Sequence, residues 1–413
     1  MAKILLICYD FPPVNGSAVP RIRAMSRGLI QSGHELFVIT REPLDGEPLD
    51  SESQNGLEPA RVYRIRLLPW RLRERGSETS GLFKRLVDKI LVPSTKTRFL
   101  LKAFQAGCRI CSHHKFDLIL SSTPPHEINF VAALLSKKFG IPLFIDLRDA
   151  WVGHPGLFRG KAARNAVDSL LERISMRQAT FCTAVSDEIT ELVKKRHPRL
   201  SMKSETVYNG WEEEYFSPGI TSPGSGPLII SYLGSLGGHR SPEGLFQGLR
   251  LLKSRFPDLS ALLKVRLIGR CDDQPLQRAE ELNIRDIVTF HGQVPLREAC
   301  AEMQRSHALL LILFPEEGGM QALTGKFFYY LGAGRPIIAL AEGSLAGRWV
   351  NEHRLGICVP PGDCVCIASA IEELMERSQL GKSWNADCEF AFKFRRDRQV
   401  ERLVCLVESC FRK

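Results

Sequence analysis

The chain has 413 residues, with 56 lysines and arginines against 46 aspartates and glutamates, which gives a formal net charge of +10. This length exceeds what one ordinary hydrophobic core can organise, so two domains are expected. Hydrophobic residues at 44% and charged residues at 25% are globular values and exclude a disordered chain. The positive charge indicates anionic partners such as nucleotide phosphates or a lipid surface.

The sequence contains no pattern typical of export or of a membrane span. The first apolar run, residues 3–8, is too short for a signal peptide, and no run approaches the roughly 18 apolar residues that a span needs. Twelve cysteines without framework spacing fit a reducing cytoplasm. Cys108 and Cys111 precede two histidines, but no second ligand pair has zinc spacing, so no metal site is expected. We therefore expect a cytoplasmic protein.

The first half of the chain alternates strand and helix patterns. Residues 3–8 read as a strand buried on both faces, a proline and glycine turn follows, and a helix over residues 19–32 leads to a strand over residues 36–40. Further strands are expected over residues 117–121, 141–147 and 179–184, and further helices over residues 127–139, 160–178 and 186–197. Such βαβ units indicate a parallel sheet, which binds ligands at the carboxyl ends of its strands.

The stretch from Arg61 to Lys102 is strongly basic, and apolar residues over positions 82–91 recur at helical spacing between the cations. A basic amphipathic helix can lie on an anionic membrane surface. The alternative is an ordinary surface helix that packs on its own domain. No recognised motif or interleaved aromatic pattern accompanies the cations, so nucleic-acid binding is not expected.

Two polar turns follow strands of the first half. Residues 121–126 end in His126, and residues 148–151 begin with Arg148 and Asp149. Both turns lie at strand carboxyl ends, where a doubly wound sheet places its site. His126 is a candidate ligand contact, with a capping or buried histidine as the alternative.

The second half of the chain again alternates strand and helix patterns, after a linker. Residues 221–227 have the clearest linker composition in the chain, so a domain boundary is expected near them. Strands are then expected over residues 228–233, 263–269, 288–292 and 308–313, with helices up to residue 256, over residues 363–377 and over residues 398–411. The last helix is expected to cross back onto the first domain.

Residues 318–338 read as a glycine loop, a helix and a strand. Thr324 can cap the helix with its hydroxyl, and the unpaired N–H groups of the first turn suit a phosphate. Lys326 adds a positive charge in that turn, which the helix dipole disfavours unless an anion lies between them. The alternative is an ordinary helix with a solvated Lys326 and with Gly334 as its C-cap.

The segment KFFYYLGAGRPII, residues 326–338, resembles the donor-site helix of the family-4, group 1 glycosyltransferases. Further similar segments cover nearly the whole chain: YDFPPVNGS at 9–17, DLRDAW at 146–151, VYNGW at 207–211, VTFHG at 288–292 and VPPGD at 359–363. The resemblance implies a retaining enzyme with the α/β GT-B fold, in which two Rossmann-like, doubly wound parallel-sheet domains face a cleft. Residues 1–216 would bind the acceptor and residues 217–384 the nucleotide-sugar donor, with a helix at about 385–413 packing back on the first domain.

The resemblance also implies the site. Arg240 and Lys326 would be the catalytic residues, because they would stabilise the leaving diphosphate. The arginine that the family has directly after the loop glycine is absent, being Ser235 here. The implied substrate-binding residues are Asn15, Gly16, Ser17, His126, Arg148, Asp149, Gly234, Gly319, Met320, Gln321, Thr324, Gly325 and Tyr329. No metal or further cofactor is implied, because the GT-B fold usually stabilises the leaving group with side chains and a helix end.

Two positions depart from the family pattern. The family usually has glutamates where Gln321 and Tyr329 stand, the later one on the donor ribose and the earlier one on the transferred sugar. Both side chains here can still hydrogen-bond hydroxyl groups. We therefore expect a hexosyltransferase acting on a glycan or lipid-linked acceptor in bacterial lipopolysaccharide or exopolysaccharide assembly, peripheral at the inner face of the plasma membrane. The alternatives are a non-catalytic sugar-nucleotide-binding partner protein and a nucleotide-sugar epimerase.

Overall fold

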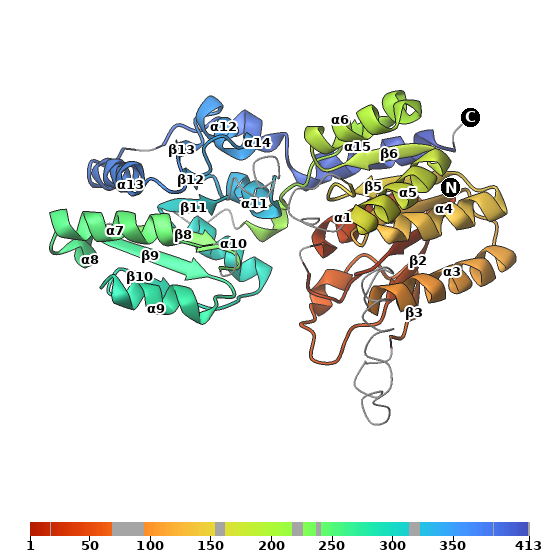
Figure 1. The fold of residues 1–413 in the computed structure, drawn as a ribbon, viewed down its shortest axis with the longest axis horizontal. Coiled ribbons are helices and arrows are strands. Elements are labelled where there is room, and N and C mark those ends of the chain that lie inside the picture. Colours follow the sequence, from red (N-terminus) through yellow and green to blue (C-terminus); the bar gives the residue numbers. More distant parts are fainter. Residues whose placement is uncertain are drawn as a thin grey trace. The chain divides into compact units, whose positions relative to one another are not determined.

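The computed structural model describes residues 1–16, 18–67, 95–152, 162–216, 226–236, 241–313, 323–382 and 384–411. They form two compact units, Met1–Tyr208 together with Asp397–Lys413, and Asn209–Arg396 (Figure 1). The chain therefore passes into the second unit at Tyr208 and returns at Arg396, whereas the sequence placed these transitions near residues 216 and 384.

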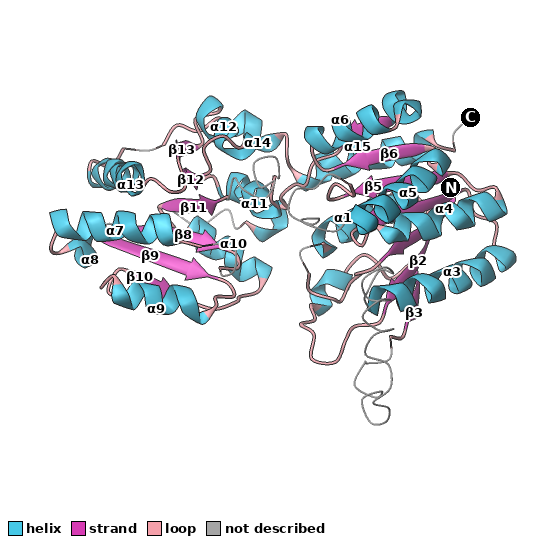
Figure 2. Cartoon of the chain, viewed as in Figure 1, coloured by secondary structure: helices cyan, strands magenta, loops and turns pink. Residues whose placement is uncertain are grey.

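The first unit contains a seven-stranded parallel sheet in the order β3-β2-β1-β4-β5-β6-β7. Figure 2 shows its strands in magenta with helices in cyan packed beside them. Its strands are β1 (Lys3–Cys8), β2 (Glu35–Arg41), β3 (Arg61–Ile65), β4 (Leu118–Thr123), β5 (Leu143–Leu147), β6 (Phe181–Ala184) and β7 (Ser204–Thr206). Its helices are α1 (Val19–Gln31), α3 (Thr95–His113), α4 (Glu127–Phe139), α5 (Ala162–Gln178), α6 (Asp187–Arg196) and α15 (Arg396–Ser409), with short 3-10 helices at Ser51–Gln54 and Pro198–Lys203. The strand order reverses between β1 and β4, which is the doubly wound arrangement.

The core of the first unit lies on both faces of its sheet. Alternate residues of β1 point to opposite faces, so Leu5 and Ile7 pack with α3 and α4 while Ile4 and Leu6 pack with α1 and α15. Helix α1 lies close to the last helix, because a Cβ added to Gly28 would lie 2.3 Å from Val400. The end of the chain is thus part of the core that surrounds its first strand.

The second unit contains a six-stranded parallel sheet in the order β10-β9-β8-β11-β12-β13. Its strands are β8 (Leu228–Leu233), β9 (Leu263–Ile268), β10 (Val288–Phe290), β11 (Ala308–Ile312), β12 (Ile337–Leu340) and β13 (Gly356–Val359). Its helices are α7 (Glu243–Arg255), α8 (Leu259–Leu262), α9 (Asp273–Glu281), α10 (Leu296–Gln304), α11 (Gly325–Ala333), α12 (Leu345–Glu352), α13 (Cys364–Gln379) and α14 (Cys388–Phe392), with a 3-10 turn at Glu213–Tyr215. Helices α7 and α13 cover the face that Ile230 and Tyr232 of β8 bury.

The doubly wound parallel sheets confirm the expected fold class, and most expected elements lie within a few residues of their predicted bounds. The start of the basic stretch is different, because residues 61–65 form strand β3 at the sheet edge. The amphipathic pattern at positions 82–91 lies outside the described residues. None of the described helices combines the length and the apolar character that crossing a membrane requires.

Candidate functional site

Lys326 lies in the first turn of α11, beside the carboxyl end of β8. Its Nζ donates a hydrogen bond to Tyr232 Oη at 2.9 Å and lies 4.2 Å from the centre of that ring, which is a cation–π distance. Tyr232 Oη in turn donates to the carbonyl of Ser235 at 3.0 Å. The ammonium group is therefore held at the turn that follows β8.

Two glycines make this close approach possible. Gly234 has φ +149°, and a Cβ added there would lie 2.5 Å from Lys326 Nζ. Gly269 follows β9 with φ +140°, and its Cβ would lie 2.2 Å from the carbonyl oxygen of Gly234. Only glycine adopts such backbone angles without strain and leaves room for the neighbouring chain. The backbone after β8 therefore packs directly against the lysine, and the backbone after β9 packs against Gly234.

The N-terminus of α11 begins at Thr324, but the predicted hydroxyl cap is wrong. Thr324 is the N-cap residue by its extended backbone, and its side chain makes no capping bond. The Phe327 N–H, which such a hydroxyl would accept from, instead donates to the Thr324 carbonyl at 3.0 Å. Thr324 Oγ1 is buried and has no hydrogen-bond partner among the described residues. At the other end Gly334, with φ +64°, is the expected C-cap.

Tyr329 points from α11 toward the places where the chain enters and leaves the second unit. Its hydroxyl donates to Glu212 Oε2 at 2.8 Å, and Glu212 Oε1 lies 3.5 Å from Arg396 Nε. Burial and the Glu212 carboxylate raise the pKa of Tyr329 well above its ordinary value, so the hydroxyl is a neutral donor. Burial lowers the pKa of Arg396, but Glu212, Tyr329 and Tyr215 together more than offset this and hold it above its usual range. The hydroxyl at the position of the family glutamate therefore has a partner within the unit.

The candidates of the first unit gather at the carboxyl edge of its sheet. The Arg148 guanidinium donates to the carbonyls of Thr123 and Pro124, each at 3.0 Å, and burial lowers the pKa of Arg148. His126 is buried and stacks on Trp151, with 5.7 Å between ring centres. It precedes α4 without capping it, because its side chain makes no capping bond. Asp149 is exposed beside Arg148.

A buried ion pair stabilises this carboxyl edge of the first sheet. Asp146 of β5 is fully buried, and Arg21 of α1 donates to both of its carboxylate oxygens, at 2.7 and 3.1 Å. The hydroxyls of Ser122 and Thr183 donate to the same carboxylate, each at 2.9 Å. Burial alone would raise the pKa of Asp146, but Arg21 and these hydroxyls hold it below its ordinary value. Arg21 also donates to the Tyr208 carbonyl at 3.0 Å, so the network joins three strands to the end of the unit.

The loop after β1 carries the remaining described candidates of the first unit. Asn15 is exposed, and its N–H donates to the Pro48 carbonyl at 3.0 Å. The Gly16 carbonyl accepts from the N–H of Val19 at 3.0 Å, which begins helix α1. These contacts place the loop at the same carboxyl edge as Arg148, because β1 and β5 are parallel and separated only by β4.

Two known families cover most of the chain. Residues 16–202 match the family described as Glycosyl transferase 4-like domain, and residues 229–377 match Glycosyl transferases group 1. The chain belongs to the group 1 glycosyltransferases. A glycogen synthase of Mycobacterium tuberculosis is 22% identical over 379 residues, which cover 91% of this chain and 86% of that protein. The probable glycosyltransferase WbjE of Pseudomonas aeruginosa is 22% identical over 295 residues, which cover 67% and 71% of the two chains.

Solved structures confirm the GT-B fold of this glycosyltransferase. Anabaena Alr3699/HepE in complex with UDP superposes with a TM-score of 0.66 at 16% identity, covering 98% of this chain and 100% of that chain. The lipopolysaccharide outer core galactosyltransferase WaaB superposes with a TM-score of 0.62 at 15% identity, covering 98% and 99%.

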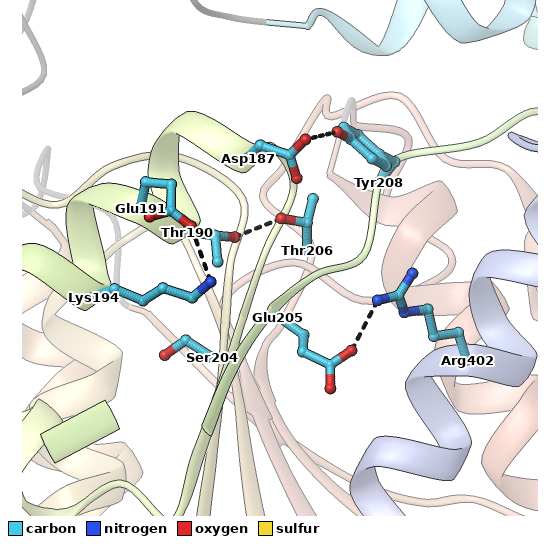
Figure 3. Close-up of a pocket in the computed structure, with 9 residues that line it drawn as sticks. All are labelled: Asp187, Thr190, Glu191, Lys194, Ser204, Glu205, Thr206, Tyr208 and Arg402. Carbon is cyan, nitrogen blue, oxygen red and sulfur yellow. Dashed lines mark hydrogen bonds and ion pairs between the residues drawn. The ribbon is translucent and has the colours of Figure 1, made fainter. Parts of the chain in front are cut away.

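A polar pocket of about 280 Å³ lies in the first unit of the glycosyltransferase, between α6, β7 and α15 (Figure 3). Its lining residues are Asp187, Thr190, Glu191, Lys194, Ser204, Glu205, Thr206, Tyr208 and Arg402. Eight of them pair with one another, as the dashed lines of Figure 3 show, and Tyr208 Oη donates to Asp187 at 2.6 Å. A ligand would have to displace these bonds, so we assign the pocket no role in binding.

The described residues hold part of the expected site of the glycosyltransferase. Lys326, Gly234, Thr324 and Gly325 come together at the N-terminus of α11. Arg240, Ser17, Gly319, Met320 and Gln321 lie outside the described residues. Sequence reasoning missed Tyr232, Glu212 and Arg396. The position of Tyr232, two residues before the strand-end Gly234, is a sequence pattern from which its role could have been predicted. Glu212 and Arg396 have no such pattern in the sequence around them.

Proposed function

We propose that this group 1 glycosyltransferase is a retaining enzyme that transfers a hexosyl unit from a nucleotide sugar to a glycan or lipid-linked acceptor. The observation that carries the proposal is the position of Lys326, at the N-terminus of α11 and against the backbone of Gly234. The leaving diphosphate gains negative charge in the transition state, and a fixed ammonium and a helix N-terminus stabilise it there. The acceptor hydroxyl attacks from the leaving-group face, which retains the anomeric configuration.

Several further features of the proposal rest on the relatives. HepE has been crystallised with UDP and with UDP-glucose, which supports a uridine nucleotide sugar as the first donor to test. WaaB is named for lipopolysaccharide outer core synthesis, which supports a bacterial surface polysaccharide as the product. In this proposal the enzyme works in the cytoplasm at the inner face of the plasma membrane, and no metal takes part in the transfer.

The first test is calorimetric titration of UDP, GDP, ADP and CMP, with a matching nucleotide sugar for each, into wild type and Lys326→Met. Methionine keeps the length of the side chain and removes the charge. We expect one nucleotide to bind, and the variant to weaken it by roughly 10- to 100-fold, because hydrogen bonds to charged groups contribute about 1.5–3 kcal/mol. Lys264→Ala removes the same charge from the surface of the same unit, where Lys264 bonds a backbone carbonyl. It should not change the affinity.

Turnover tests the rest of the proposal. The nucleotide sugar that binds is incubated with extracted lipid-linked glycans, and the anomeric configuration of the product is read by proton NMR, with and without a metal chelator. An inverted product, or activity that the chelator abolishes, would contradict the proposed mechanism. Equal nucleotide affinity of wild type and Lys326→Met would show that Lys326 is not part of the nucleotide-binding site.

Non-catalytic binding of a nucleotide sugar is the second candidate function. The Tyr329 hydroxyl, at the position of a family glutamate, is engaged by Glu212 rather than directed to a ligand. Nucleotide binding without turnover, over all acceptors tried, would favour this second candidate.

A further inference from the structure

Helix α3 carries two cysteines on one face. Of the twelve cysteines, all of which lie in the described part of the chain, only Cys108 and Cys111 share a helix at a spacing of three or four positions. Residues at this spacing are neighbours on a helix surface. Helix geometry sets their Cα atoms about 5 Å apart, within the range of about 4.4–6.8 Å that a disulfide requires. Both cysteines are only partly buried.

The neighbouring helix brings a cation to the first of these thiols. Helices α3 and α4 pack closely at Gly107, where an added Cβ would lie 2.4 Å from a leucine side chain of α4. Lys138 of α4 lies beside Cys108, and its Nζ donates a hydrogen bond to Cys108 Sγ at 3.5 Å. The same ammonium lies 6.0 Å from the ring centre of Phe104 and 5.6 Å from that of Phe139, which are cation–π distances. Groups from both helices therefore hold Lys138 at the sulfur.

The two thiols differ in their surroundings. Burial, and to a lesser extent negative charge on Cys108, raise the pKa of Cys111 to about 11, so Cys111 keeps its proton at neutral pH. A thiolate is the form that attacks an oxidant, and an ammonium beside a sulfur stabilises negative charge on it. Cys108 is therefore the thiol that reacts first, and Cys111 is the one that follows.

The end of α3 leaves room for the two sulfurs to meet. The helix ends at His113, two positions after Cys111, so only its last turn has to shift. Ser112 Oγ donates to the Cys108 carbonyl at 2.8 Å, which helps to hold the rest of that turn. Among the described residues, no group of three histidine, cysteine, aspartate or glutamate side chains could hold a metal ion, so the two thiols are not half of a metal site there.

We propose that Cys108 and Cys111 form a peroxide-sensitive dithiol that closes to a disulfide. The inference is independent of the transferase activity. In the first step the Cys108 sulfur attacks one oxygen of hydrogen peroxide, the O–O bond breaks, and the departing hydroxide takes the thiol proton to form water. Cys108 is then a sulfenic acid.

In the second step the Cys111 sulfur attacks the Cys108 sulfur. The S–O bond breaks, the S–S bond forms, and the departing hydroxide takes the Cys111 proton to form a second water. Two thiols have lost two electrons in total, and one peroxide has been reduced to two molecules of water.

The test uses the full chain, reduced and then freed of reductant, with hydrogen peroxide as the oxidant. After oxidation the remaining thiols are blocked with iodoacetamide, and the chain is digested with trypsin. Trypsin cleaves after Arg109, between the two cysteines, so the peptides 103–109 and 110–115 stay joined only where the disulfide has formed. Mass spectrometry follows the joined peptides over time, and dithiothreitol should separate them. A non-reducing gel distinguishes this product from a link between two copies of the chain.

The variants separate the roles of the three side chains. Cys111→Ser should abolish the joined peptides and leave Cys108 as a sulfenic acid, which dimedone traps. Lys138→Met should slow the loss of the Cys108 thiol by about two- to five-fold, which is the size of effect that exposed charge pairs have. Lys138→Arg keeps the charge and should restore most of the rate. Lys137→Met removes the same charge from the adjacent exposed position, and it should leave the rate unchanged.

Cys405 is the internal control, because it is exposed on α15 and its oxidation is followed in the same digest. Joined peptides within a single chain, formed faster than Cys405 is oxidised, support the inference. Absence of the joined peptides, or their formation only between two copies, overturns it. Oxidation of Cys405 as fast as that of Cys108, or a rate that Lys138→Met does not change, also overturns it, because the dithiol would then have no reactivity of its own.

Discussion

Replacing Tyr329 with phenylalanine should destabilise the second unit by about 2 kcal/mol, because it removes a hydrogen bond to a buried carboxylate. The hydroxyl lies 2.8 Å from Glu212 Oε2, and Tyr329 is 7% exposed. The other oxygen of Glu212 is 3.5 Å from Arg396, which is long for a hydrogen bond. The carboxylate would therefore keep one weak partner. Hydrogen bonds to charged groups contribute about 1.5–3 kcal/mol, which brackets the expected loss.

A double-mutant cycle measures the interaction directly. Tyr329→Phe, Glu212→Gln and the double variant are unfolded in urea and followed by tryptophan fluorescence. Glu212→Gln alone should cost about 3 kcal/mol or more, because it leaves the buried Arg396 without its counter-charge. The double variant should be less destabilised than the sum of the single variants, by about 1–2 kcal/mol.

Tyr63→Phe is the matched control, because its ring stacks on Phe37 and its hydroxyl has no hydrogen-bond partner among the described residues. It should change the free energy of unfolding by less than about 0.5 kcal/mol. If Tyr329→Phe were no more destabilising than Tyr63→Phe, or if the effects in the cycle were additive, the hydroxyl would not be anchored to Glu212 and our account of α11 would fail.

Three further predictions concern the buried ion pair and the strand-end glycine. Asp146→Asn should destabilise the first unit by about 3–5 kcal/mol in urea unfolding, because Arg21 would remain buried without a counter-charge; a loss below about 1 kcal/mol would contradict this reading. The pKa of Asp146 is lowered in the folded chain, so its contribution is complete above about pH 4 and is lost as the pH falls through that lowered pKa. The stability of the wild type should therefore fall more steeply than that of Asp146→Asn when urea midpoints are compared from about pH 5 to pH 3, and parallel curves would show that the ion pair does not titrate this way. Gly234→Ala should weaken nucleotide binding by roughly ten-fold in calorimetry, because the new Cβ would displace Lys326 Nζ and strain the backbone. Gly226→Ala, where a Cβ meets no atom within 4 Å, should not change the affinity, and equal effects of the two substitutions would exclude displacement of the lysine.

The central strands were predictable from sequence because they are continuous apolar runs. Strands β1 and β11 are buried on both faces, and polar residues do not alternate with apolar ones along them. The edge strands β3 and β7 were missed for the opposite reason. Strand β3 is short and carries arginines at positions 61 and 64 without a period of two, and Ser204–Thr206 is polar, so neither has a distinctive hydrophobic pattern.

The candidate site was predictable only where it is local in sequence. A glycine after a strand and a lysine in the first turn of a helix are visible as patterns, and they lie together in the structure. The role of Tyr329 was not predictable, because its partner Glu212 is 117 positions away and the contact exists only after the chain folds.

The return of the chain to the first unit has a consequence for synthesis on the ribosome. Leu403, Val404 and Val407 of α15 complete the core around β1, yet the whole of Asn209–Arg396 is made before them. The first unit can begin to form early, but the part of its core that α15 covers stays exposed until the last helix is made, while the second unit can fold as soon as it emerges. The unit that contains the N-terminus is therefore the one whose folding ends last, and its exposed apolar face is the surface that chaperones would have to shield during translation.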